Sequence, residues 1–241
     1  MFSRKDWGSG SDGEQFTKTL SRLKREGASV LVVGSVRADQ RRNVCRRLLG
    51  QATVQPRRRV LVSTTGDLHD VSHLVDADIN TSDTLKLVSY ATQARSTAAS
   101  DTSSDTIEAD APSLEASPTT TTALADLGIA ISSAIEELES EANGFAPAEL
   151  RVGINSLVPL LEEYGVERVF KFVHLTNGRT RDADGMIHYH LPMDRNSDVV
   201  SVLEPLFDIV VELREQSGDF QERWSINDGD QSSGWISIDQ S

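Results

Sequence analysis

Residues 30–50 read VLVVGSVRADQRRNVCRRLLG, which places an apolar run, a glycine and a polar segment in that order. The apolar run ends at Gly34, and the polar segment then carries apolar residues at helical spacing: Val44, Cys45, Leu48 and Leu49. A buried strand, a glycine turn and a helix N-terminus together frame the phosphate-binding loop of many α/β proteins. A loop of the form G-x-x-x-x-G-K-[ST] needs Gly, Lys and Ser or Thr at 39–41, where this chain has Asp39, Gln40 and Arg41. The stretch therefore predicts a strand and a helix, and it leaves open whether the turn between them binds a nucleotide.

Strand-like and helix-like segments alternate along most of the chain. Apolar runs predict strands at 30–33, 59–64, 85–89, 150–154, 168–175, 186–191, 207–213 and 220–226. Helical spacing predicts helices at 12–26, from a cap at Ser35 or Asp39 to 49, at 124–138 behind a threonine cap, at 157–164 and at 199–206. A short helix and a loop are expected at 67–80, and a further loop at 176–185.

Continuous apolar runs are typical of inner strands that are covered on both faces. We therefore expect an α/β fold with a mostly parallel central sheet, helices on both faces and an antiparallel pair of C-terminal strands. The carboxyl ends of the inner strands, after Val33, Thr64, Ile154 and His174, would then share one edge of the sheet. Folds of this class bind their ligands at that edge.

Composition changes abruptly at residues 96–122, STAASDTSSDTIEADAPSLEASPTTTT. This segment has almost no large apolar side chains and cannot bury enough surface to offset its ordering entropy, so we expect a disordered acidic insertion. Neither flank forms a complete set of elements, which predicts one domain at 12–226 interrupted by the insertion. Flexible tails are expected at 1–11 and at 227–241.

The charge balance is acidic, with 37 Asp and Glu against 24 Lys and Arg and a net charge of −13. An acidic, lysine-poor surface keeps a protein dissolved at high salt, which indicates a halophilic cytoplasmic protein; an acidic mesophilic protein is the alternative. The single cysteine, Cys45, excludes an intramolecular disulfide and fits a reducing compartment. No run approaches 18 apolar residues and the N-terminal stretch has no apolar centre, so no membrane span and no signal peptide are expected.

Several stretches resemble the RecA-like ATPase core, and most closely its KaiC-type branch. LRVGINSLVPLLEEYG (150–165) resembles the strand that carries the Walker B acid and the helix after it. VLVSTTGD (60–67) resembles the second strand, RVFKFVH (168–174) the strand that ends in a polar sensor residue, here His174, and LFDIVVELRE (206–215) and QERWSI (221–226) the late strands. The resemblance covers about 30–95 and 123–226 and implies a RecA-like P-loop NTPase fold.

The departures from that family fall on its chemistry. The Walker A lysine and hydroxyl are absent, Asn155 stands at the Walker B position, and Thr65-Gly66-Asp67 stands where the catalytic glutamate follows the second strand. The chain thus resembles haloarchaeal KaiC/RecA-like proteins with degenerate Walker motifs, a group without a settled function. The resemblance implies no catalytic residue and at most a vestigial nucleotide edge, with ATP possible as a ligand but not hydrolysed. That edge consists of Gly34, Ser35, Arg37, Arg41, Asn155 and Ser156.

Positive charge is concentrated at 37–59, where eight arginines accompany one acidic residue. The expected partner or nucleic-acid surface consists of Arg41, Arg42, Arg46, Arg57, Arg58 and Arg59. Such a segment can contact nucleic acid or an acidic protein. The alternative is a solvated helix face that pairs with acidic groups of the same chain or of another subunit.

Other chemistry-bearing residues have structural explanations. His174, His188 and His190 lie near Asp182, Asp184 and Asp194 in the sequence, but we expect His188 and His190 to be a structural pair around Tyr189 and no metal to bind. Ser156 with His174 does not match a hydrolase elbow and is expected to cap a helix. Cys45 is expected to be a small core residue.

The sequence thus predicts a non-catalytic regulatory or scaffolding protein, a pseudo-ATPase that acts in signalling through a protein partner or a homo-oligomer. A divergent ATP-binding signalling ATPase is the first alternative. A nucleic-acid-associated protein that uses the arginine-rich segment is the second.

Overall fold

The computed structural model describes residues 11–50, 56–66, 74, 84–91, 118–226 and 231–238. Its described helices are α1 (Ser11–Glu26), α2 (Ala38–Leu48), α5 (Leu124–Ala142), α6 (Val158–Asp182) and α7 (Asp198–Leu203), which continues into a 3₁₀ turn, η2 (Glu204–Leu206). Its described strands are β1 (Ala28–Val33), β2 (Arg58–Ser63), β3 (Leu85–Tyr90), β4 (Thr119–Thr121), β5 (Leu150–Ile154), β6 (Met186–Leu191), β7 (Ile209–Gln216), β8 (Asp219–Ile226), β9 (Gln231–Ser232) and β10 (Ile236–Ser237).

The described strands form one sheet in the order β10-β8-β7-β1-β6-β5-β2-β3-β4, with β9 beside β8. Every neighbouring pair from β7 to β4 is parallel, whereas β7 and β8 form an antiparallel hairpin and β9 and β10 pair antiparallel with β8. The predicted α/β class, mostly parallel central sheet and antiparallel C-terminal strands are therefore confirmed.

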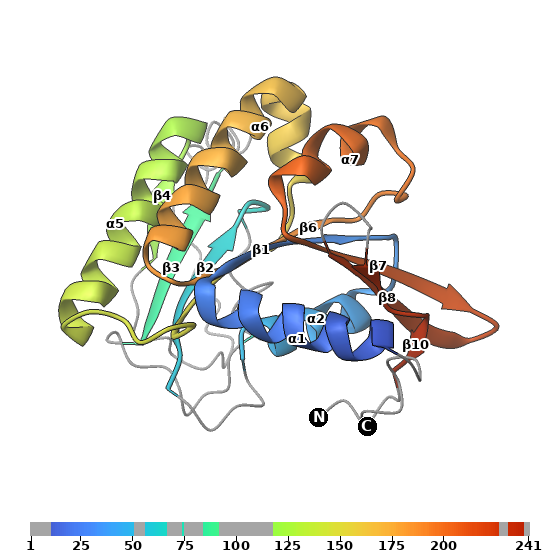
Figure 1. Cartoon of the computed structure of the whole chain (residues 1–241). Helices are drawn as coiled ribbons and strands as arrows, with labels where there is room; N and C mark the ends of the chain where they lie inside the picture. The colour runs from blue at the N-terminus through green and yellow to red at the C-terminus, as the bar shows by residue number, and fades with distance from the viewer. Residues whose placement is uncertain are drawn as a thin grey trace, which may run out of the picture.

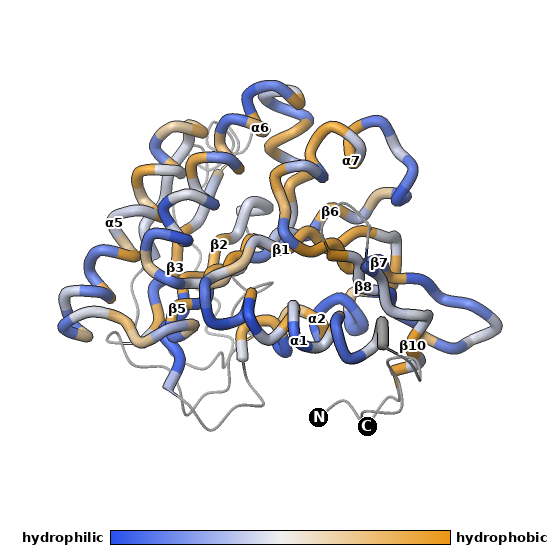
Figure 2. The backbone as a smooth tube through the Cα atoms, viewed as in Figure 1, coloured by the Kyte–Doolittle hydropathy of each residue, from blue (hydrophilic) through white to orange (hydrophobic). Residues whose placement is uncertain are grey.

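Helices cover the sheet from both faces, as predicted. α5, α6 and α7 lie on one face, and α1 and α2 lie on the other (Figure 1). Every residue of the two central strands β1 and β6 is buried, because both of their faces are covered. The backbone tube is hydrophobic where the helices face the sheet and hydrophilic toward solvent (Figure 2).

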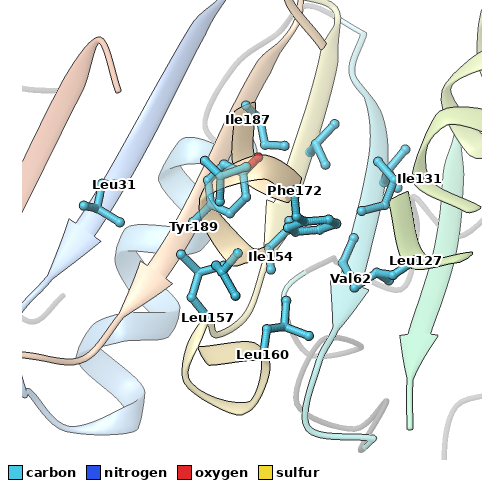
Figure 3. Packing of buried hydrophobic residues seen from close by; sticks show 14 of the residues in the cluster. Leu31, Val62, Leu127, Ile131, Ile154, Leu157, Leu160, Phe172, Ile187 and Tyr189 are labelled. Atoms are coloured by element: carbon cyan, nitrogen blue, oxygen red, sulfur yellow. The ribbon is translucent and has the colours of Figure 1, made fainter. Parts of the chain in front are cut away.

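The larger hydrophobic core lies between the sheet and the α5–α7 layer. Tyr189 of β6, Ile154 of β5 and Val62 of β2 meet Phe172 of α6 and Ile131 of α5 there (Figure 3). The opposite face is closed by two smaller clusters, which include Phe16 and Leu20 of α1, Cys45 of α2 and Leu49 directly after α2. The predicted inner faces of both N-terminal helices are thus correct.

The prediction of a strand at 168–175 is wrong, and so is most of the predicted loop at 176–185, because the long helix α6 extends to Asp182 and only 183–185 form a turn before β6. Its buried positions, Val169, Phe172, Val173, Thr176 and Thr180, recur at intervals of three and four, which is helical spacing. Gly165, with φ of 75°, interrupts the helix where the sequence predicted its end. The strand that follows β5 is instead β6, so His174 lies exposed on a helix and not at the sheet edge.

Two predicted boundaries also differ from the structure, at the end of the insertion and at the C-terminal tail. Thr119–Thr121, at the end of the expected insertion 96–122, form β4, which pairs with β3. Residues 231–238, inside the expected tail 227–241, are held against β8 through β9 and β10, and the Trp235 ring lies 3.6 Å from the Arg214 guanidinium carbon. The remainder of the expected insertion, at 96–117, and the N-terminal tail, at 1–10, lie outside the described residues, as does the element expected at 67–80 except Leu74.

The side-chain caps predicted for α2 and α5 are not formed. Arg37 precedes α2 and Ala123 precedes α5, and neither side chain caps its helix, so Ser35, Asp39 and the threonine run do not serve as expected. Within the described part of the chain, no helix has the length and apolar character needed to cross a bilayer.

Candidate functional site

The carboxyl ends of β1, β6, β5 and β2 share one edge of the sheet. From β1 the chain passes to α2 on one face, whereas from β5 and β6 it passes to α6 and α7 on the other (Figure 1). Such a reversal opens a crevice beyond the strand ends, and ligands of α/β folds bind there. A ligand site of this fold is therefore expected at this edge.

The loop after β1 is closed by the protein's own carbonyl groups. The Gly34 N–H donates to the Met193 carbonyl at 2.9 Å, and the Ser35 hydroxyl donates to the Pro192 carbonyl at 3.0 Å. Gly34 has φ of 106°, and a Cβ there would stand 2.1 Å from the Leu213 carbonyl oxygen of β7. The glycine is thus required for the close approach of β1 to β7. Two donors of this loop, the Gly34 N–H and the Ser35 hydroxyl, are therefore already in use.

The start of α2 carries the residues that replace the phosphate-binding motif. Gln40, at the lysine position, is 1% exposed, and neither its amide nitrogen nor its amide oxygen has a hydrogen-bond partner among the described residues. Asp39 is exposed in the first turn, and Arg37 lies with its Nε 3.5 Å from a Glu215 carboxylate oxygen. Gly34, Ser35 and Arg37 therefore face β7 and the segment after β6.

Asn155 joins the end of β5 to the end of β2. Its Oδ1 accepts from the Thr64 N–H and hydroxyl, both at 2.9 Å, and its Nδ2 donates to Thr65 Oγ1 at 3.3 Å. The next residue, Ser156, accepts the Val158 N–H at 3.2 Å with its hydroxyl, although the N-cap residue of α6 is Leu157 and not Ser156 as expected. The amide at the Walker B position thus fixes two loops to each other and presents neither a charge nor a free oxygen pair for a metal ion.

A small cavity of about 150 Å³ lies at this edge. It brings together Arg41, Asn155 and Ser156 of the predicted nucleotide edge, and it is also lined by Ala38, Arg42, Cys45, Thr65, Leu74 and His190. Ligand pockets for whole cofactors usually enclose about 300–1,000 Å³. The cavity accordingly has room for a phosphate-sized group but is smaller than a typical nucleotide pocket.

The arginine-rich segment divides into an outer and an inner half. Arg42 is exposed, and Arg41 and Arg46 are half-buried on α2, as a surface role requires. Arg57 and Arg59 are buried: Arg57 donates to the Ala148 carbonyl at 2.9 Å, and Arg59 donates to the Leu49 carbonyl at 3.2 Å. Arg58 pairs with Glu149 at 3.1 Å. The prediction that Arg57 and Arg59 are part of a basic surface is wrong, because both are buried where the chain enters β2, an inner strand that α2 covers, whereas Arg58 is half-buried.

Beneath α2 the sheet carries a polar layer that consists of Cys45, His188 and His190. Cys45 Sγ lies 2.9 Å from His188 Nε2, and the His188 and His190 rings meet edge to face with centroids 5.5 Å apart. All three side chains are buried. Burial raises the pKa of the Cys45 thiol to about 12 and, with Arg151 nearby, lowers the pKa of His188 to about 3. Burial likewise lowers the pKa of His190, with His188 and Arg41 adding to the effect.

The sequence showed that His188 and His190 are two residues apart and predicted the helix that contains Cys45, but it did not show that this helix packs on the two histidines. Only the packing of α2 on β6 brings Cys45 to their face. A second spacing, His69 and His73 four residues apart, directly precedes Leu74 of the cavity lining and lies outside the described residues.

Comparison with known proteins gives a family but no activity. No curated protein matches the chain. Residues 27–213, which run from the start of β1 into β7 and include the cavity and the polar layer, match a family described as Family of unknown function (DUF7504). Because the match extends over most of the sequence, the chain belongs to this family of unknown function, DUF7504.

Proposed function

We propose that this protein is a non-catalytic regulatory or scaffolding pseudo-ATPase with a RecA/KaiC-like fold, and that it acts through protein contacts. The strand order supports the fold, since β6 alone separates β1 from β5, so the loop after β1 and Asn155 after β5 lie on one edge. The chemistry supports the loss of catalysis. Gly34 and Ser35 donate to protein carbonyls, and Asn155 is engaged with Thr64 and Thr65.

The observation that carries this proposal is an apolar groove between α5 and α6. Its cavity measures about 850 Å³, and its lining includes Ile129 of α5 and Leu175 of α6. These two side chains are 64% and 70% exposed, although leucine and isoleucine are normally buried. An apolar patch with a polar rim is typical of a surface that contacts another protein.

The rim of the groove favours a second copy of the same chain as the partner. Glu136 lies on the α5 side, and Arg168 and Lys171 lie on the α6 side. Under a two-fold axis, α5 of one copy meets α6 of the other, so each acidic rim faces a basic rim while the apolar residues meet in the centre. The same charges would disfavour a parallel contact of α5 with α5.

Sedimentation and light scattering of the full chain in high-KCl buffer test this contact. We expect a concentration-dependent dimer that the double variant Ile129→Asp/Leu175→Asp abolishes. Val202→Asp is the matched control, because Val202 is a 47% exposed apolar residue on α7, outside the groove. Glu136→Arg should weaken the dimer, and the double variant Glu136→Arg/Arg168→Glu should restore it. A chain that stays monomeric at every concentration, or a dimer that survives the double variant, would contradict the proposed contact.

Calorimetry with ATP and Mg²⁺ separates the proposal from its first alternative. Saturable binding of ATP that Arg41→Ala abolishes would support a divergent nucleotide-binding protein, because Arg41 lines the small cavity at the sheet edge. We expect no saturable binding of the whole nucleotide. The nucleic-acid alternative has lost support from Arg57 and Arg59, which are buried.

A further inference from the structure

We propose that Cys45, His188 and His190 form a binding site for a thiophilic transition-metal ion, Zn²⁺ or Cu⁺. The open coordination position of this ion would face the small cavity at the carboxyl edge of the sheet. This inference does not depend on the proposed protein contact.

The three side chains already lie within the space of one coordination shell. Their ligand atoms all lie within 4.8 Å of one another. Bonds of about 2.3 Å to sulfur and about 2.0 Å to nitrogen place the ligand atoms of one ion roughly 3.5 Å apart. The Cys45–His188 contact of 2.9 Å would therefore lengthen slightly as the ion enters. Thiolate and imidazole are the ligands that Zn²⁺ and Cu⁺ prefer.

His190 provides the second, independent observation. It is 2% exposed, and neither of its ring nitrogens has a hydrogen-bond partner among the residues that the structure describes. A buried imidazole without a partner is costly to fold, and native proteins rarely keep one without a reason. A metal ion would take the lone pair of one of these nitrogens.

The orientation of His188 also fits a metal ligand. Its ring makes a hydrogen bond to the backbone of Val152, which leaves Nε2 directed at Cys45. Metal-binding histidines usually have such a backbone partner on their other nitrogen, because it fixes the tautomer and the ring plane. Gly153, opposite His188 on β5, leaves the space that the ring occupies.

The charges around the site determine how each ion would be held. Arg41 and Arg46 act on Cys45, Arg151 acts on His188, and Arg41 also acts on His190. Binding replaces the thiol proton, which leaves to solvent, by a metal–sulfur bond. Cu⁺ with one thiolate and two neutral imidazoles is uncharged and suits these surroundings. Zn²⁺ leaves one positive charge, so it needs an anion as fourth ligand in the cavity, where Arg41 and Arg42 would stabilise that anion.

The test uses the full chain, reduced and stripped with a chelator, and titrated separately with Zn²⁺ and with Cu⁺ against a chromogenic competitor. We expect one ion per chain, and we expect chloride or azide to strengthen the binding of Zn²⁺ but not that of Cu⁺. Co²⁺ serves as a spectroscopic substitute for Zn²⁺, and a thiolate-to-cobalt charge-transfer band should appear in wild type and disappear in Cys45→Ala.

His190→Gln should weaken binding by more than the ~10–100-fold loss that is typical of residues outside the ligand set. His174→Gln is the matched control. His174 is exposed on α6, so its replacement should leave metal binding unchanged. Circular dichroism checks that each variant folds. If Cys45→Ala does not fold, Cys45→Ser replaces it in the test. Absence of stoichiometric binding of either ion, or binding that Cys45→Ala and Cys45→Ser leave unchanged, would overturn the proposal.

Discussion

Gly153 of β5 lies directly across from His188 of β6, and the missing side chain of the glycine makes room for the imidazole. A Cβ on Gly153 would stand 2.8 Å from His188 Cε1 and 3.3 Å from Leu49 Cδ2. Contacts this short force the ring or the covering helix α2 to move. The glycine therefore sets the distance between α2 and the sheet at the polar layer.

Gly153→Ala should lower the free energy of unfolding by about 1–3 kcal/mol, the usual cost of an overpacked core. Urea denaturation followed by circular dichroism measures the change. Gly178→Ala is the control, because Gly178 lies in α6 with nothing within 4 Å of an added Cβ and should gain about 0.5–1 kcal/mol from helix propensity. If Gly153→Ala leaves the free energy of unfolding unchanged, the His188 ring can adopt another position at no cost in stability.

Glu222 of β8 and Arg47 of α2 form a buried ion pair that ties the second helix to the C-terminal hairpin. The Glu222 side chain is completely buried, and both of its oxygens accept from the Arg47 guanidinium. Glu222→Gln should cost about 2–3 kcal/mol of unfolding free energy, because it leaves the arginine without its charge partner. Glu26→Gln breaks an exposed helical pair with Arg22 and should cost less than about 0.5 kcal/mol. Equal effects of the two substitutions would contradict a special role for the buried pair.

Local sequence patterns were sufficient to predict most of the fold. β1, β2, β3, β5 and β7 each contain a short apolar run, and this continuous apolarity correctly indicated a sheet that is covered on both faces. The error at α6 has a physical origin. The run RVFKFVH satisfies both an alternating and a helical pattern over so few residues, and only the buried Thr176 and Thr180 further on distinguish the two.

The site was harder to predict than the fold, because the role of each site residue depends on contacts between segments that are distant in the sequence. Arg41, Asn155 and Ser156 were correctly grouped, since they follow strands that end at one edge. The roles of Gly34 and Ser35 could not be predicted, because their partners, Met193 and Pro192, lie over 150 residues away in the sequence. Arg59 was assigned to the surface because charge usually indicates exposure, and a buried arginine is an exception to that rule.

Arg151 of β5 is a further exception to the rule that charged side chains are exposed. It lines a cavity of about 680 Å³ at the amino-terminal edge of the sheet, together with Lys24, Arg47 and Arg57. Arg151 is 5% exposed, and its Nε and Nη1 have no hydrogen-bond partner in the described part of the chain. Burial and the nearby Arg57 and Arg59 lower the pKa of Arg151, and burial with Arg151 and Arg47 lowers the pKa of Lys24. A positive charge in this cavity therefore lowers the free energy of unfolding.

Replacing that charge should stabilise the protein, and so should neutralising it with an anion. We expect Arg151→Met to raise the free energy of unfolding by about 1–3 kcal/mol in KCl, since a buried charge without good partners is worse than an apolar side chain of similar size. Sulfate or phosphate at the same ionic strength should raise the melting temperature of wild type more than that of Arg151→Met, because an ion that binds only the folded state stabilises it by mass action. Arg22→Met, at an exposed position of α1, controls for the change in net charge. If Arg151→Met destabilises the protein and the anion effect is the same in both variants, the guanidinium must be well solvated in the cavity, and the positive cluster has no preference for anions.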